Sequence, residues 1–232
     1  MAYDFILPAG IMMHMQRTIA SDAEMTRYYL SGVHVEPIPG GGAFLVATDG
    51  HAMLIHRASK ALAVRAATIK LVEPKLPHEI DEWGEPVVMD WSRVHVRIST
   101  LTETPFAAQL VHQGREDPHM HIIAEEIRGP FPNWRKPLDS DFSASRQALK
   151  PGPRIDHVDA RRLARICALW SAVRITQLRQ DHPHLITMED DPDTPGVLAP
   201  RAVRAPDTPP LTDMLTAIGR QDILQAGGGT DG

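Results

Sequence analysis

The stretch that decides the fold is Arg27-Tyr28-Tyr29-Leu30-Ser31-Gly32-Val33-His34-Val35-Glu36, followed by Ala43-Phe44-Leu45-Val46-Ala47-Thr48-Asp49-Gly50-His51. The first segment alternates apolar and polar residues from Tyr29 onward, and the second is a compact apolar run, so both are expected to be extended. Between them, Pro37-Ile38-Pro39-Gly40-Gly41-Gly42 combines prolines, which cannot continue a ladder, with glycines, which allow positive φ. The sequence therefore predicts a β-hairpin with a loose tip, then a tight turn at 48–51 and a third strand over 52–56.

Two separated motifs carry a resemblance to a known family. The segments RYYLSGVHVE (27–36) and LVATDGHAMLI (45–55) resemble the middle domain of the bacterial replicative sliding clamp, the beta subunit of DNA polymerase III, which has R-Y-x-L-N-G-x-x-x-E and V-A-T-D-G-H-R-L there. The segment GPFPNWRKPL (129–138) is similar to the motif G-x-F-P-[DN]-Y-R-x-[VL]-[IL]-P, which closes that domain in the family. A weaker similarity links 196–201 to the last strand of the clamp, V-[VM]-[ML]-P-[ML]-R.

The resemblance implies an α+β fold of the DNA-clamp type, with two antiparallel sheets and few helices on one side. Residues 1–138 would form a unit like the middle domain, 139–153 a linker, 154–205 a partial C-terminal half-unit and 206–232 a flexible tail. Family members close rings from six similar domains, and this chain offers about one and a half. A ring would therefore need several copies, and we expect a homo-oligomer if one forms.

Composition excludes several classes of protein. Of 232 residues, 43% are hydrophobic and 23% are charged, which suits a globular chain with a core. We expect no membrane span, since no apolar run approaches ~20 residues, and no signal peptide, since the N-terminus lacks a basic region. A single cysteine, Cys167, suits a reducing, cytoplasmic compartment. The net charge of −5 is unusual for a nucleic-acid binder, although a clamp needs only a locally positive inner face.

Helices are expected at two places. Residues 8–25 put Ile11, Met12, Met15 and Ile19 on one face, leaving His14, Gln16, Arg17 and Thr18 on a face that would meet either DNA, as in the family, or only solvent. Asp159 can cap a second helix that runs to Trp170. Residues 58–66 fit either a helical turn or an ordered loop. Further strands are expected over 68–72, 87–89, 94–98, 106–111, 120–124, 155–158, 172–178, 185–189 and 196–201.

One segment departs from the family. Where the clamp has the second helix of its middle domain, residues 73–86 carry three prolines and five acids. Prolines break helices and acids repel DNA, so we expect at most one helical turn, near 77–83. This weakens the expectation of a positive inner wall.

The family resemblance implies a peptide-binding groove between the middle and last domains. It would receive extended peptides rich in Gln, Leu and Phe from DNA polymerase or repair proteins, with apolar walls for burial and polar groups for register. The alternative is that these positions are ordinary core and turn residues of a degenerate relative. Mapped onto this sequence, the wall residues are Leu30, Thr48, Gly50, His51, Met53, Pro132, Lys136, Pro137, Val197, Leu198, Ala199 and Pro200.

Five arginines are candidates for contact with duplex DNA without sequence specificity. Arg161 and Arg165 lie one turn apart on the second helix, and Arg162 follows Arg161. Arg154 precedes this helix, and Arg17 lies on the first one. Arginines there would touch phosphates and read no bases, as sliding requires. A solvated helix face is the alternative.

We predict no enzyme, metal or cofactor. The histidine pairs His119/His121 and His182/His184 lack the three or four converging ligands of a metal site. No nucleophile elbow, P-loop or zincin motif is present. Cys167 lies on an apolar helix stripe and is expected to be buried and inert. The tail segment 221–224 faintly resembles clamp-binding peptides.

The sequence leaves three hypotheses for the function of the protein. The leading one is a processivity or docking factor that tethers replication or repair proteins on DNA. The second is an adaptor that binds clamp-interaction peptides, or modulates a normal clamp, without encircling DNA. The third, a hydrolytic enzyme, lacks any catalytic spacing. The acidic segment 73–86 favours the adaptor, whereas the arginines at 161–165 favour the ring.

Overall fold

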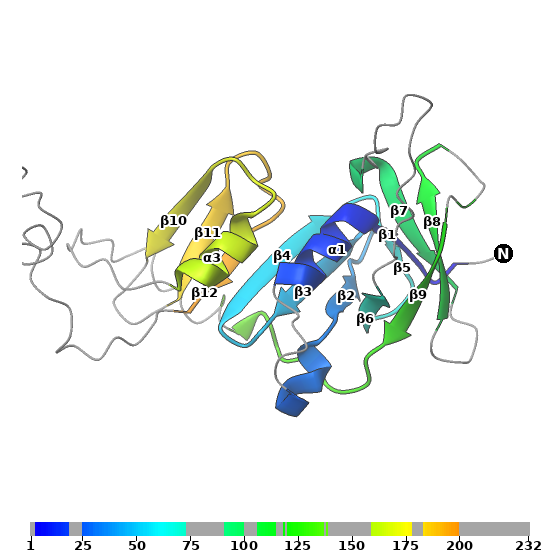
Figure 1. The fold of residues 1–232 in the computed structure, drawn as a ribbon, viewed down its shortest axis with the longest axis horizontal. Helices are drawn as coiled ribbons and strands as arrows, with labels where there is room; N and C mark the ends of the chain where they lie inside the picture. Colours follow the sequence, from blue (N-terminus) through cyan, green and yellow to red (C-terminus); the bar gives the residue numbers. More distant parts are fainter. Residues whose placement is uncertain are drawn as a thin grey trace, which may run out of the picture. The chain divides into compact units, whose positions relative to one another are not determined.

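The computed structural model describes residues 3–18, 25–72, 91–99, 106–114, 118, 120–136, 138, 159–177 and 183–199 (Figure 1). Contacts group residues 1–200 into one compact unit. Several predictions lie outside the described residues: the helical turn near 77–83, the strands at 87–89 and 155–158, the linker and the tail. The elements, in chain order, are β1 (Phe5–Pro8), α1 (Ala9–Thr18), the 3-10 helix η1 (Met25–Leu30), β2 (Val33–Pro37), β3 (Ala43–Thr48), β4 (Ala52–Ala58), β5 (Leu62–Ala63), β6 (Ala67–Val72), the 3-10 helix η2 (Trp91–Arg93), β7 (Val94–Ile98), β8 (Phe106–His112), β9 (Met120–Glu126), α3 (Ala160–Cys167), β10 (Val173–Gln177), β11 (His184–Met188) and β12 (Gly196–Leu198).

The strands pair in the order β10-β11-β12-β4-β3-β2-β6-β9-β8-β7-β1-β5. Every pair is antiparallel, which confirms the predicted α+β fold with an antiparallel sheet architecture. In place of the two sheets that we expected, the described strands join into one continuous ladder. The pairing of β6 with β9 joins strands β2, β3, β4 and β6 to strands β1, β5, β7, β8 and β9. Strand β12 pairs with β4 and extends the sheet on that side.

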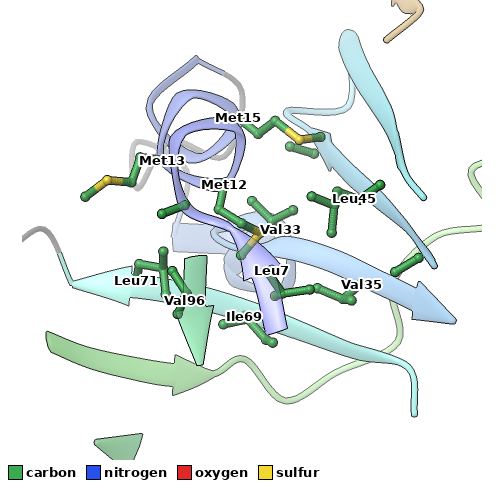
Figure 2. Packing of buried hydrophobic residues seen from close by; sticks show 14 of the residues in the cluster. Leu7, Met12, Met13, Met15, Val33, Val35, Leu45, Ile69, Leu71 and Val96 are labelled. Carbon is green, nitrogen blue, oxygen red and sulfur yellow. The ribbon is translucent and has the colours of Figure 1, made fainter. Parts of the chain in front are cut away.

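The main core lies between the sheet and the helices. Alternation along β3 and β4 places Leu45 and Leu54 on the face that α1 covers, and both are fully buried. Met12 and Met15 of α1 pack into the same cluster (Figure 2). Ile166 of α3 joins it, so both helices bury their apolar stripes on one face of the sheet. Each fully buried side chain contributes about 1.5–3 kcal/mol.

The first helix differs from its predicted bounds and faces. Pro8 ends β1, a strand the sequence did not indicate, and helix α1 begins at Ala9. His14, expected on the exposed face, is buried, and its Nε2 lies 3.3 Å from the carbonyl oxygen of Ile166. Gln16 bonds the backbone of Leu71 through both its amide nitrogen and its oxygen. This face of α1 therefore packs against the protein.

The segment before β2 is not extended, so the prediction of a strand from Arg27 was wrong. Residues 25–30 form η1, and its end is fixed by Ser31, whose backbone N–H and hydroxyl both donate to the Tyr28 carbonyl. A Cβ on Gly32 would lie 2.9 Å from the carbonyl oxygen of Ile69, so glycine lets the chain pass close to β6. A 3-10 helix forms here in place of a strand because the chain must turn to enter the sheet.

The hairpin and most other strands are confirmed. Gly40, Gly41 and Gly42 have φ values of 91°, 118° and 84°, which only glycine adopts readily. Residues 58–66, expected as a turn or loop, contain the two-residue strand β5. Helix α3 ends at Cys167 and stops short of Trp170, whose N–H closes a turn onto the Cys167 carbonyl. None of the described helices combines the length and the apolar character that crossing a bilayer demands.

Candidate functional site

A row of side chains crosses three strands on the sheet face opposite the helices. Thr48 of β3 pairs with Met53 of β4, and Met53 pairs with Val197 of β12. Directly paired residues in antiparallel strands share a face. Val46 and Ile55 form the next pair on this face. These two residues, Met53 and Val197 are all buried in a second hydrophobic cluster.

The motif at 129–138 packs on this second cluster. Trp134 is buried, and Phe131 and Leu138 pack beside it. The indole N–H of Trp134 donates to Glu36 at 3.1 Å, and the Phe44 and Trp134 rings lie 5.4 Å apart. A motif adjacent to the row thus supplies aromatic side chains to the same face.

Arg135 fixes the motif to β2. Its two terminal nitrogens donate to the two carboxylate oxygens of Glu36 at 2.9 and 2.8 Å. This bidentate bond holds the pKa of Glu36 below its usual value, although burial works in the opposite direction. The Arg135 guanidinium also lies 4.0 Å from the Trp134 ring centroid. The motif is therefore anchored by charge as well as by apolar contact.

The turn between β3 and β4 is held by side-chain bonds. Thr48 Oγ1 donates to the Ala52 carbonyl and accepts the N–H of Gly50, which has a φ of 85°. The His51 carbonyl accepts the N–H of Ala199 at 2.7 Å, which ties the end of β12 to the turn. The turn and the last described strand thus form one edge of the site.

Asp49 joins this turn to helix α3. Its Oδ1 accepts the N–H groups of His51 and Ala52, at 2.8 and 2.7 Å. Its Oδ2 accepts from Arg162 Nε at 3.0 Å and lies 3.6 Å from a terminal nitrogen of Arg165. Burial raises the pKa of Asp49, but the two backbone bonds and Arg162 outweigh it, so the pKa is lowered. The aspartate is therefore ionised at neutral pH.

The predicted peptide-site residues fall into two groups. The structure brings together what we call the Met53 site: Thr48, Gly50, His51, Met53, Val197 and Ala199. Pro132 and Lys136 are exposed within the adjacent motif. Leu30 is buried at the end of η1, and Leu198 is fully buried on the opposite face, in the main core. Pro137 and Pro200 lie outside the described residues.

Sequence reasoning missed the residues that hold this site together. Trp134 and Arg135 were read only as parts of a motif, and Glu36 only as a strand residue. Asp49 was read as a turn residue, with no partner on α3. The available signal was the charge pairing within the motifs, since Glu36 ends the first and Arg135 lies within the second.

The arginines proposed for DNA contact differ in their surroundings. Arg161 is exposed, whereas Arg162 bonds both Asp49 and Asp159. Arg165 shares Asp49 with Arg162. The side chain of Arg17, and all of Arg154, lie outside the described residues. Two of the three arginines on α3 thus serve an internal contact.

Potential metal ligands and the cysteine are spread out in the described part of the chain. There, no three histidine, cysteine or acidic side chains gather as a metal site would need. His121 is exposed and His184 is buried, while His119 and His182 are not described. Cys167 is free and half-buried, and burial raises the pKa of its thiol.

Among comparisons with known proteins, the one with solved structures shows the fold. No protein-family model and no curated protein matches the sequence. Among solved structures, the DnaN sliding clamp (DNA polymerase III subunit beta) from Bartonella birtlesii, bound to griselimycin, aligns with a TM-score of 0.51 and 17% identity over 88% of this chain and 68% of that chain. A DNA polymerase sliding clamp from Pseudomonas aeruginosa with ligand aligns with a TM-score of 0.53 and 13% identity over 87% of this chain and 66% of that chain. One from Bacillus subtilis aligns with a TM-score of 0.51 and 12% identity over 86% of this chain and 64% of that chain.

These similarities show the fold and leave activity open. The chain spans about two thirds of the length of these clamps. At 11–17% identity the shared property is the backbone arrangement. The chain has the mostly antiparallel sheet with helices that bacterial DNA polymerase III beta sliding clamps have.

Proposed function

We propose that this protein is a non-enzymatic relative of sliding clamps that docks DNA polymerase or repair proteins through short Gln-, Leu- and Phe-containing peptides. The observation that carries the proposal is the row Thr48, Met53 and Val197, in which strands β3 and β4 meet β12, a strand far from them in the sequence, on one face. The proposal includes the peptide-binding role of the site, assembly of the protein into a homo-oligomer and a cytoplasmic location.

The chemistry of the Met53 site suits an extended peptide. Met53 and Val197 lie at the base of the site, 6% and 5% exposed, and a leucine or phenylalanine laid over them would gain burial energy. Exposed His51 and Lys136 offer polar groups that would fix the register of the peptide. Methionine adapts its shape to different side chains, which suits a site with several clients.

A binding titration tests this proposal. A fluorescently labelled Gln-Leu-Phe-type peptide is titrated with wild type, Met53→Ala and His51→Ala. Met53→Ala is expected to weaken peptide binding about tenfold. His51→Ala removes the imidazole and is expected to weaken binding by a smaller factor. His121→Ala, an exposed histidine on β9, is the matched control and should bind like wild type. Equal affinity of all four proteins would remove the Met53 site from the proposal.

One observation favours the second function, an adaptor that does not encircle DNA. Arg162 and Arg165 bond Asp49, so part of their charge is already neutralised. Together with the net charge of −5, this weakens attraction to phosphates. The test combines light scattering with duplex DNA binding at several salt concentrations. A monomer with peptide affinity and no DNA affinity identifies the adaptor, and a stable oligomer with salt-dependent DNA affinity identifies the clamp.

A further inference from the structure

A cavity of about 540 Å³ opens on the helix-bearing face, away from the Met53 site. Among the described residues, its walls come from β1 and α1, from η2, from β4, from the segment after α3 and from the loop after β11. The apolar walls include Ile11, Met13, Trp91, Leu169 and Trp170. The volume lies within the range of small-molecule sites. Neither the main core nor the proposed peptide site accounts for this space.

Two polar groups in the wall are hydrogen-bond acceptors. The Thr194 hydroxyl donates its single proton to Asp191 Oδ2 at 2.5 Å, so it must accept from His56 Nδ1, which lies 2.6 Å away. This assigns the ring proton of neutral His56 to Nδ1 and leaves Nε2 as an acceptor without a partner among the described residues. Burial lowers the pKa of His56, although Asp191 and Asp193 oppose this effect, and the ring stays neutral at pH 7. His56 and Asp191 both line the cavity.

Among the described residues, Asp191 is the charged side chain that lines the cavity, and no lysine or arginine does. An adjoining pocket, which shares Pro8, His56 and Ser92 with the cavity, is lined by Arg57 and Lys60 as well as Asp193. The loop that carries Asp191 also contains Glu189, Asp190 and Asp193. His14, the remaining polar wall residue apart from Ser92, is bonded to Ile166, and its ring forms a T-shaped pair with Trp170, with ring centroids 5.2 Å apart. A ligand here would meet aromatic and aliphatic walls together with acceptors.

We propose that this cavity binds a small organic cation, an ammonium group carried on an aromatic or aliphatic body. The ammonium would donate to the Asp191 carboxylate and to Nε2 of His56. Its apolar body would contact Trp91 and Trp170, whose ring faces also attract positive charge. Nothing in the proposed peptide-docking function requires this site.

The probe is 2-phenylethylamine, compared with 2-phenylethanol and 3-phenylpropionate, which keep the phenyl ring and change the charge. Binding to the full chain is followed by calorimetry and by tryptophan fluorescence. The amine is expected to bind at least about tenfold more tightly than the alcohol, because hydrogen bonds to charged groups are the stronger ones. Trp91 and Trp170 both line the cavity, so the double variant Trp91→Phe/Trp170→Phe should remove most of the fluorescence response, whereas Trp134→Phe, on the other face of the sheet, should retain it.

A matched pair of variants tests the site at its mouth. Leu169 is 55% exposed, so replacing it should leave the fold intact. Leu169→Arg places a cation at the cavity and is expected to reduce amine affinity at least about tenfold, whereas Leu169→Glu should retain or increase it. Asp191→Asn should weaken the amine and leave the alcohol unchanged. Equal binding of amine and alcohol, no saturable binding, or equal affinities in Leu169→Arg and Leu169→Glu would overturn the proposal.

Discussion

Asp49 offers a prediction in which the two oxygens of one carboxylate can be tested separately. Oδ1 accepts two backbone N–H groups of the turn, and Oδ2 receives the arginines of α3. Asp49→Asn can keep Oδ1 as an acceptor but loses the ion pairs. Asp49→Ala loses both sets of bonds.

The structure sets the magnitudes. Asp49→Ala loses two backbone bonds to a charged acceptor with 14% side-chain exposure, which cost about 2–4 kcal/mol, in addition to the ion pairs. The side chain of Arg162 is 30% exposed, and it keeps Asp159 as a partner, so solvent screening limits the cost of Asp49→Asn to about 1 kcal/mol. For a chain of this size, the corresponding falls in Tm are roughly 4–16 °C and 2–4 °C.

The assay is urea unfolding of wild type, Asp49→Asn, Asp49→Ala and Arg162→Ala, with the double variant Asp49→Asn/Arg162→Ala to close the cycle. The folded-state pKa of Asp49 is depressed, so its contribution is full above the unfolded value near 3.8 and is lost as pH falls through the lower folded value. The advantage of wild type over Asp49→Asn should shrink over that range. Equal stability of the Asn and Ala variants would refute the division of labour between the two oxygens.

Three further predictions concern other parts of the fold. Glu36→Gln weakens the bidentate bond to Arg135 and should cost about 0.5–1 kcal/mol in urea unfolding, with a shift in tryptophan emission; because the pKa of Glu36 is lowered, this loss should fade below pH 4.5. Gly42→Ala, at φ +84° with its Cβ 2.8 Å from a β4 carbonyl, should lower Tm more than Gly40→Ala, which has φ +91° and open space; equal shifts would contradict the contact argument. Met12→Ala removes a fully buried core side chain and should cost about 2–5 kcal/mol by denaturant titration.

Local signals predicted the parts of the fold that depend on neighbouring residues. The three glycines at 40–42 predicted the hairpin tip because positive φ is a property of the residue itself. Asp159 predicted the start of α3 because its side chain caps N–H groups two and three residues ahead. Alternation located β7 and β11, where burial follows every second residue.

Tertiary contacts decided the rest. His14 is buried next to Ile166, a residue 152 positions away in the sequence, so local spacing did not predict its burial. Val197 and Leu198 were both assigned to the peptide site, but the register of β12 on β4 sends them to opposite faces. The alternation at 29–35 suggested a strand through Tyr29, yet a 3-10 turn forms there because β2 must enter beside β6. Sequence spacing carries no information about these contacts.

The three-residue strand β12 also covers the edge of strand β4, which could otherwise pair with another chain. It occupies the outer side of β4 at residues 52–54, and backbone bonds from Ile55 and Arg57 to the loop before β12 continue the cover. Without this cover, a seven-residue strand that begins with four apolar residues would present free N–H and C=O groups to other molecules. A shortened chain that ends before residue 196 would thus carry a template for intermolecular strand pairing. The last described strand therefore covers this edge only after the chain has been extended through residue 198.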